Sequence, residues 1–185
     1  MPYEPPPELA ALSLAEIAAL VQARGLPPVD QWQPASIGES HMVITADGRW
    51  FHEGGQITRP AMVRAFSSLL MRDPAGQHWL VTPHEKLRIE VEDAAFIAVD
   101  LAQESGALAF RLNSDDTVIA GPDHPIRAAG DADTPALYLA VRHGTEARLN
   151  RSTYGQLAEI ALAKNEQGGA LSVTSMGADF TLVPR

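Results

Sequence analysis

The chain has 185 residues, 45% of them hydrophobic and 20% charged, which is enough for one domain or for two compact halves. It has no cysteine, which excludes disulfides, thiolate nucleophiles, zinc–thiolate sites and iron–sulfur ligation. The net charge of −9 argues against non-specific binding to nucleic acid or anionic membranes. The chain has neither a bilayer-spanning apolar stretch nor a basic signal-peptide region, so we expect a cytoplasmic protein.

The first 25 residues are expected to form an N-terminal arm and a helix. Residues 1–12 are rich in proline, and Ser13 with Glu16 makes a capping box that begins a helix. Gly25 ends this helix. An apolar stripe at helical spacing predicts that the helix docks on the body of the protein, although a stripe of this kind can also bind a partner. The stripe comprises Leu14, Ile17, Ala18 and Val21.

Residues 26–103 are predicted to form an N-terminal α+β domain. Asp47-Gly48 is typical of a tight hairpin turn between two short strands. Thr58 is expected to cap a helix that has Pro60 in its first turn and ends at Asp73-Pro74. Alternating and continuous apolar runs predict the strands of this half. These strands are expected at 42–45, 50–52, 78–81, 87–91 and 96–99.

Residues 104–185 are predicted to form a second α+β domain of related build, with the boundary near Gln103–Gly106. Thr153 and Gln156 resemble a capping box for a helix that runs to about Ala163. A short echo between residues 44–47 and 112–115, with one helix among several strands in each half, suggests repeated structural units. The strands of this half are expected at 108–112, 117–120, 137–142, 147–149, 171–175 and 180–183.

Cations, hydroxyls and aromatic rings are concentrated between Asp47 and Phe96, and together they could hold an anionic ligand. Arginine and lysine bind phosphate or carboxylate, and aromatic faces stack on a base. The alternation of residues 87–91 places Lys86 on the face opposite Leu87, from which it could project into a groove. Equally, the aromatic residues could be core and the arginines ion-paired. The candidate ligand-binding residues are Trp50, His52, Arg59, Arg64, Phe66, Ser67, Thr82 and Lys86, with Asn113 and Arg142 from the second half.

No motif in the sequence indicates a catalytic residue, a cofactor or a metal site. Two glycines follow His52-Glu53, so this pair is not part of a zinc-binding HExxH helix. The neighbouring carboxylates Glu92-Asp93 and Asp115-Asp116 point to opposite faces if they lie on strands. The sequence therefore favours a binding protein over an enzyme. A phosphoester hydrolase that uses His52 with Glu53, or His84 with Glu85, is the least favoured alternative.

The run Asp47–Gly54 and several motifs after it resemble the bacterial domain-of-unknown-function 1285 family. The likeness extends from about Pro27 to Tyr154, with Gln56 and Ala95 standing where proline is usual. The motifs that carry it are Ile57, Arg59, Phe66-Ser67-Ser68, Leu80-Val81-Thr82-Pro83, Glu85-Lys86 and Val91-Glu92-Asp93-Ala94.

This resemblance implies a two-part α+β protein with repeated units, whose C-terminal half is similar to a pleckstrin-homology barrel. It also implies a groove between the halves that binds a nucleotide-like ligand, with a role in signal transduction. The resulting hypothesis is a protein that binds an anionic small molecule, with a signalling protein as a second partner. A protein-interaction module without a small ligand is the alternative.

Overall fold

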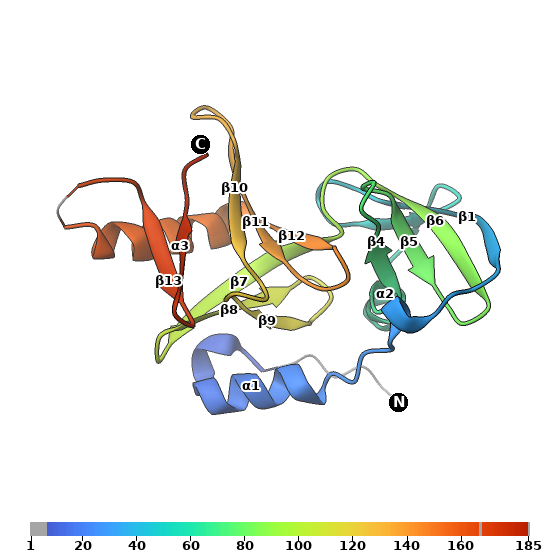
Figure 1. Cartoon of the computed structure of the whole chain (residues 1–185), viewed down its shortest axis with the longest axis horizontal. Helices are drawn as coiled ribbons and strands as arrows, with labels where there is room; N and C mark the ends of the chain where they lie inside the picture. Colours follow the sequence, from blue (N-terminus) through green and yellow to red (C-terminus); the bar gives the residue numbers. More distant parts are fainter. Residues whose placement is uncertain (1–6, 167, 185) are drawn as a thin grey trace.

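A computed structural model describes residues 7–166 and 168–184 and shows two six-stranded sheets beside each other, with a helix below one of them (Figure 1). No helix within these ranges is long and apolar enough to cross a membrane. The helices are η1 (Leu9–Ala11), α1 (Leu14–Ala23), η2 (Val29–Gln31), α2 (Pro60–Ser67) and α3 (Arg151–Lys164). The strands are β1 (Ser36–Ile44), β2 (Trp50–His52), β3 (Gly55–Ile57), β4 (Leu70–Arg72), β5 (His78–Val81), β6 (Glu85–Val91), β7 (Phe96–Glu104), β8 (Ala107–Leu112), β9 (Thr117–Ile119), β10 (Ile126–Gly130), β11 (Pro135–Ala140), β12 (Glu146–Leu149), β13 (Ser172–Ser175) and β14 (Ala178–Thr181).

Both sheets have the same topology. The first has the order β3-β2-β1-β6-β5-β4 and the second the order β10-β11-β12-β7-β8-β9. Each consists of two three-stranded antiparallel meanders that meet at a central parallel pair, β1 with β6 and β7 with β12. The expectation of an α+β fold with two related units is therefore confirmed. We call the first sheet with α2 the first half, and the second sheet with α3 and the β13–β14 hairpin the second half.

The echo between residues 44–47 and 112–115 does not join equivalent parts of this repeat. Residues 44–47 lead from the first strand of one sheet into its second strand, whereas residues 112–115 lead from the second strand of the other sheet into its third. The helices also differ in position, because α2 precedes β4 and α3 follows β12. The repeat is thus visible in strand order and not in this sequence match.

One large hydrophobic core runs through both halves. It contains Ile44 and Trp50 from the first sheet, Phe96 and Phe110 from the second, and Leu157 from α3, all 2% exposed or less. Burial of such side chains contributes roughly 1.5–3 kcal/mol each. The continuity of this core holds the two sheets in a fixed relation.

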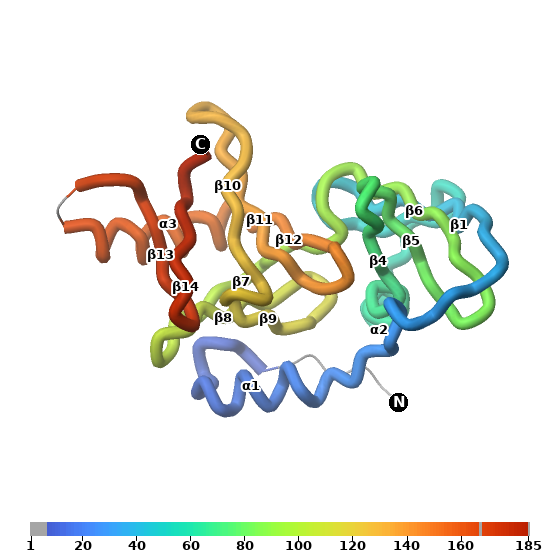
Figure 2. Tube along the Cα trace, in the orientation of Figure 1, coloured from blue at the N-terminus to red at the C-terminus, as the bar shows by residue number. Residues whose placement is uncertain are grey.

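The N-terminal helix forms as expected and docks on the second half. Ser13 and Glu16 make both hydrogen bonds of the capping box, at 3.3 and 2.7 Å. Ile17 is fully buried against Leu9 and Ala109. Figure 2 shows α1 running beside the second half before the chain crosses to the first.

Several predicted boundaries are wrong because tertiary pairing overrides local signals. α2 ends at Ser67, not at Asp73, since residues 70–72 pair with β5 as strand β4. α3 begins after Asn150, whose side chain caps it, so Thr153 lies inside the helix and not at its cap. β10 (Ile126–Gly130) forms where no strand was predicted.

The change from one sheet to the other falls earlier in the chain than the expected boundary near Gln103–Gly106. β7 spans Phe96–Glu104 and pairs with β8 and β12 of the second sheet. The first half therefore ends after β6. The similarity of the C-terminal half to a pleckstrin-homology barrel stays a prediction.

Candidate functional site

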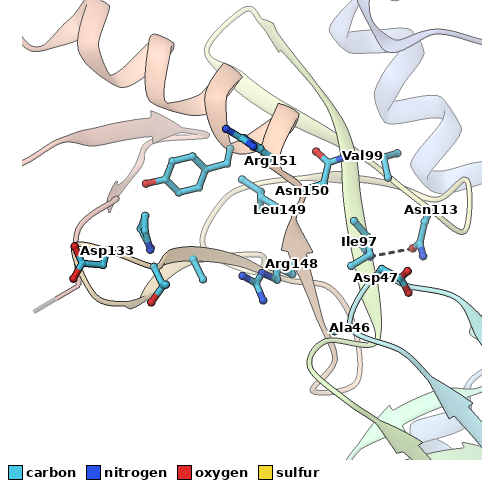
Figure 3. A pocket seen from close by; sticks show the side chains of 14 residues that line it. Ala46, Asp47, Ile97, Val99, Asn113, Asp133, Arg148, Leu149, Asn150 and Arg151 are labelled. Atoms are coloured by element: carbon cyan, nitrogen blue, oxygen red, sulfur yellow. Dashed lines mark hydrogen bonds between the residues drawn. The ribbon is translucent and has the colours of Figure 1, made fainter.

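A cavity of about 790 Å³ lies where the first half meets the second (Figure 3). The first half contributes the β1–β2 turn, and the second contributes β7, β12, the β10–β11 hairpin and the start of α3. This volume is within the range of small-molecule sites. The lining residues are Ala46, Asp47, Ile97, Val99, Asn113, Asp133, Thr134, Pro135, Ala136, Arg148, Leu149, Asn150, Arg151 and Tyr154.

The start of α3 brings hydrogen-bond donors and positive charge to this cavity. Asn150 caps the helix by accepting from the Thr153 N–H at 2.8 Å, and Arg151 follows at its first position with an exposed side chain. The first N–H groups of a helix have no partners within the helix and favour an anion. Arg148 lines the cavity from β12, and its guanidinium donates to Asp93 at 2.8 Å.

The acidic groups of the lining stand apart from the two arginines. Figure 3 shows Asp47 and Asp133 toward opposite ends of the cavity, with Arg148 and Arg151 between them. Hydrogen bonding from Thr45, and then the charge of Arg49, lowers the pKa of Asp47, so that carboxylate is ionised at neutral pH. The cavity therefore offers a cationic centre flanked by hydrogen-bond acceptors.

Asn113 fixes the contact between the halves at the wall of the cavity. Its Oδ1 accepts from the Ile97 N–H at 3.0 Å (Figure 3). Its Nδ2 donates to the Gly48 carbonyl at 3.3 Å. Ile97, Leu149 and the half-exposed Val99 add apolar surface. The cavity thus combines two arginines at its middle with an apolar wall, and the Asn113 side-chain amide holds that wall against the β1–β2 turn.

Replacing Gly48 with alanine is expected to push the β1–β2 turn away from the second half. Gly48 has φ +83°, and a Cβ there would lie 2.6 Å from Ile97 Cγ1 and 2.7 Å from Asn113 Nδ2. Left-handed backbone costs about 1–2 kcal/mol and overpacking about 1–3 kcal/mol, so we expect Gly48→Ala to lower the free energy of unfolding by roughly 2–5 kcal/mol. Urea denaturation measures this change.

Gly54→Ala is the matched control, because Gly54 has φ +84° but open space around its Cβ position. It should show the backbone cost alone, about 1–2 kcal/mol. Equal losses for the two variants would contradict the proposed packing of Gly48.

The ten residues predicted from the sequence do not surround this cavity, and only Asn113 lines it. Trp50 and Phe66 belong to the core, where their rings stack with centroids 6.3 Å apart and Trp50 is 2% exposed. Trp50 is therefore enclosed by the core, and Phe66 is partly buried against it. Neither ring lines the large cavity, so their predicted role in packing a base finds no support there.

Lys86 lies on the opposite face of the first sheet from Trp50. Its ammonium is 4.4 Å from the centre of the Trp79 ring, which packs in a separate cluster with Val29 and Val81. The alternation of residues 87–91 predicted the face correctly, since Ile89 is buried in the main core. Lys86 was expected to project into a groove, but its ammonium lies over the Trp79 ring and it does not line the large cavity.

Three other predicted residues occupy separate positions on the first half. His52 is exposed at the end of β2, and Arg59 is exposed at the cap position of α2. Thr82 organises the β5–β6 turn, where its hydroxyl accepts from the N–H groups of His84 and Glu85 at 3.3 and 3.1 Å. None of these three side chains lines the large cavity.

Arg64, Ser67 and Arg142 do come together, at a second contact between the halves. Arg142 donates to the Ser67 carbonyl at 3.2 Å and to the Asp116 carboxylate at 3.1 Å. Arg64 donates to the Ser114 carbonyl at 3.4 Å. Asp116 is 3% exposed and is also bound by Arg24, so this cluster joins α1 and α2 to the β8–β9 turn.

Sequence reasoning missed the residues that start α3 and line the large cavity, which are Arg148, Asn150, Arg151 and Tyr154. A usable signal existed in Asn150, because asparagine is among the strongest helix-capping residues. Placing the cap at Thr153 moved the helix start past both Asn150 and Arg151. Within residues 7–166 and 168–184, no group of three or more His, Asp or Glu side chains is close enough to hold a metal ion.

Comparisons with known proteins identify one family along most of the chain. The model for "Domain of unknown function (DUF1285), N-terminal domain" matches residues 27–94, and the model for "Protein of unknown function (DUF1285), C-terminal domain" matches residues 95–182. The two matches meet where the first sheet gives way to the second. No protein with a curated description matches the sequence.

Two crystal structures of bacterial proteins are similar to this chain. A DUF1285 family protein from Silicibacter pomeroyi DSS-3 is 39% identical with a TM-score of 0.77, covering 92% of this chain and 93% of that one. A DUF1285 family protein from Shewanella baltica OS155 is 24% identical with a TM-score of 0.53, covering 64% of this chain and 90% of that one, and it supports the fold alone. The chain therefore belongs to the DUF1285 family.

Proposed function

We propose that the protein binds a small anionic molecule with a ring system, of which a nucleotide is the nearest class, in the cavity between its halves. The observation that carries this proposal is the joint position of Arg148, Arg151 and the start of α3 on one cavity of about 790 Å³. A phosphate there would meet two guanidiniums and free backbone N–H groups.

The rest of the cavity suits the neutral part of such a ligand. Tyr154 and the apolar side chains of Ile97 and Val99 offer surface for a ring. Asp47 and Asp133 accept hydrogen bonds toward the two ends, where sugar hydroxyls or a base N–H would donate.

A ligand held in this cavity would touch both halves of the protein. Ala46 and Asp47 come from the first half and all other lining residues from the second. Ligand binding would therefore stabilise one arrangement of the halves, and a partner protein could bind that arrangement selectively. The proposal therefore includes a role in signal transduction, and it keeps the cytoplasmic location expected from the sequence. A pleckstrin-like second half would be the surface that partner contacts.

Thermal-shift screening with nucleoside monophosphates, diphosphates and cyclic nucleotides tests the proposal. A ligand present at a hundredfold its dissociation constant should stabilise the protein by about 2.7 kcal/mol. Arg151→Glu should weaken binding at least tenfold, because it replaces an attractive charge at the start of α3 with a repulsive one. Isothermal titration calorimetry measures the difference.

Arg59→Glu is the matched control, since Arg59 is also exposed beside the start of a helix but lies away from the cavity. It should bind the ligand as the unchanged protein does. A ligand that binds Arg151→Glu and the unchanged protein equally, or the absence of any stabilising nucleotide, would overturn the site and favour an interaction module.

A further inference from the structure

Four arginines from four separate elements come together at the β8–β9 turn. They are far apart in the chain, so no local motif predicts that they meet. Arg24 follows α1, Arg64 lies on α2, Arg111 on β8 and Arg142 after β11. We call these four residues and Asp116 the arginine cluster. Asp116 holds two of them, because Arg24 binds one of its carboxylate oxygens and Arg142 the other.

The remaining two arginines of the cluster have only carbonyl groups as partners. Arg64 donates to the Ser114 carbonyl, and Arg111 donates to the carbonyls of Asp115 and Pro7, at 3.4 and 2.7 Å. Among the residues the structure describes, neither guanidinium forms an ion pair within 4.0 Å. Arg111 is nevertheless 8% exposed. Buried charge without an opposite charge is costly, so this cluster has unused capacity for an anion.

The charges around the cluster leave an excess of positive charge. Its four guanidiniums face the carboxylates of Asp116 and of Asp100, which lies opposite Arg111 on β7, and Asp115 lines the cavity beside them. Burial lowers the pKa of Arg64, and the charge of Arg24 lowers it further. Arginine stays protonated at neutral pH even so. The lowered pKa thus reflects burial first and repulsion from Arg24 second, and a bound anion would offset both.

A small cavity lies at the two arginines that lack a carboxylate. It measures about 60 Å³ and is lined by Arg24, Arg64, Arg111, Asp115, Asp116 and Thr117, with Leu20 and Val21 of α1 as its apolar side. This is the space of roughly two water molecules at about 30 Å³ each, which admits one oxyanion group and excludes a nucleobase.

Arg142 adds a second sign of unmet hydrogen bonding. Its Nε is buried and has no hydrogen-bond partner among residues 7–166 and 168–184. Arg142 also lines a neighbouring cavity of about 160 Å³ on the side of Arg24, Asp116 and His124. On this side of the Arg24–Asp116 pair the cluster thus has a buried donor without an acceptor, and on the other side it has two guanidiniums that donate only to carbonyl groups.

We propose that the arginine cluster is a site for a single phosphate-like oxyanion, held between Arg64 and Arg111 under α1. Two guanidiniums supply paired N–H donors, which suit the oxygens of phosphate. Thr117 lines the same cavity and adds a hydroxyl. The site uses no residue of the large cavity between the halves. A test of this oxyanion site is therefore independent of whether a nucleotide binds in the large cavity.

The probe is inorganic phosphate, titrated into the full chain in a phosphate-free buffer, with sodium chloride of equal ionic strength beside it. At a hundredfold the dissociation constant, phosphate should raise Tm by about 5 °C or more, and chloride should not. Arg64→Gln should weaken phosphate binding at least tenfold by calorimetry, and Arg64→Lys should show a smaller loss because it keeps the charge but not the paired donors.

Arg59→Gln is the control at the start of the same helix and should keep the full response to phosphate. Arg151→Glu separates the two sites, because it removes only phosphate binding in the large cavity and should leave the binding that depends on Arg64. A nucleoside monophosphate whose binding also depends on Arg64 would assign the phosphate to the end of a larger molecule, and phosphate alone would assign a free ion. An equal rise of Tm with chloride, or equal phosphate binding by Arg64→Gln and Arg59→Gln, would overturn the site.

Discussion

Asp116→Asn is expected to lower the free energy of unfolding by about 3–5 kcal/mol, because it leaves two buried guanidiniums without their shared carboxylate. Asp116 is 3% exposed, and Arg24, Arg142 and the Ser114 hydroxyl all donate to it. The variant keeps the shape of the side chain and removes only its charge. Denaturation in phosphate-free buffer measures the loss.

The loss should be accompanied by release of α1. Arg24 follows this helix and attaches it to Asp116, while Ile17 is its fully buried side chain. With the ion pair gone, hydrogen exchange in α1 should accelerate more than exchange in β7 or β8, which lie in the core. Equal acceleration in all three elements would contradict the role of Arg24 and Asp116 as the attachment of α1.

The contribution of Asp116 should depend on pH in a defined direction. Burial alone would raise its pKa, but Arg142, the Ser114 hydroxyl and Arg24 outweigh this and lower it. A carboxylate whose pKa is lower in the folded protein stabilises fully above the unfolded value of about 3.9, and the stabilisation is lost as pH falls through the folded value. The difference between Asp116→Asn and the unchanged protein should therefore be constant from pH 7 to about pH 5 and shrink below about pH 4.

Asp179→Asn is the control for this prediction. Asp179 pairs with Lys164 on the surface and is 75% exposed. Exposed pairs contribute about 0–1 kcal/mol, so its replacement should change stability little at any pH. If the two asparagine variants were equally stable, the cluster around Asp116 would not be a structural connection between the halves.

Trp50→Ala is expected to cost about 3–5 kcal/mol, because it removes a large ring from the interior of the first half. Trp50 is 2% exposed and stacks on Phe66 of α2. Ligand binding measured under conditions where the variant is still folded should remain within about twofold of the unchanged protein, since Trp50 does not line the large cavity. Chemical denaturation and calorimetry measure the two quantities.

His52→Ala provides the comparison, two residues farther along β2 and exposed to solvent. Its effect on stability should fall within about 0.5 kcal/mol. The opposite pattern, a stable Trp50→Ala that loses ligand binding, would return Trp50 to the binding site predicted from the sequence.

Local signals in the sequence determined those elements whose stabilising contacts are close in the chain. The capping box at Ser13 and Glu16 starts α1, and Asp47-Gly48 turns the chain from β1 into β2. Alternation placed Ile89 in the core and Lys86 on the opposite face. These features need only neighbouring residues, and the same holds for the family motifs that identified the chain.

The arrangement of functional groups depended on contacts that are remote in the chain. The parallel pairs β1–β6 and β7–β12 join strands separated by more than a meander, and no local pattern encodes such pairing. The first pair decides that Trp50 and Lys86 lie on opposite faces of one sheet. The packing of the β1–β2 turn against β7 and Asn113 decides where a cavity forms.

The sequence by itself therefore determined the α+β class and the family, and the family implied two related units. The tertiary structure alone decided that the aromatic residues are core, that Arg64 and Arg142 meet around Asp116, and that the large cavity belongs to Arg148 and Arg151. The physical reason is that composition and periodicity specify which face of an element is buried. Only the packing of remote elements specifies which polar groups are left facing one another across a cavity.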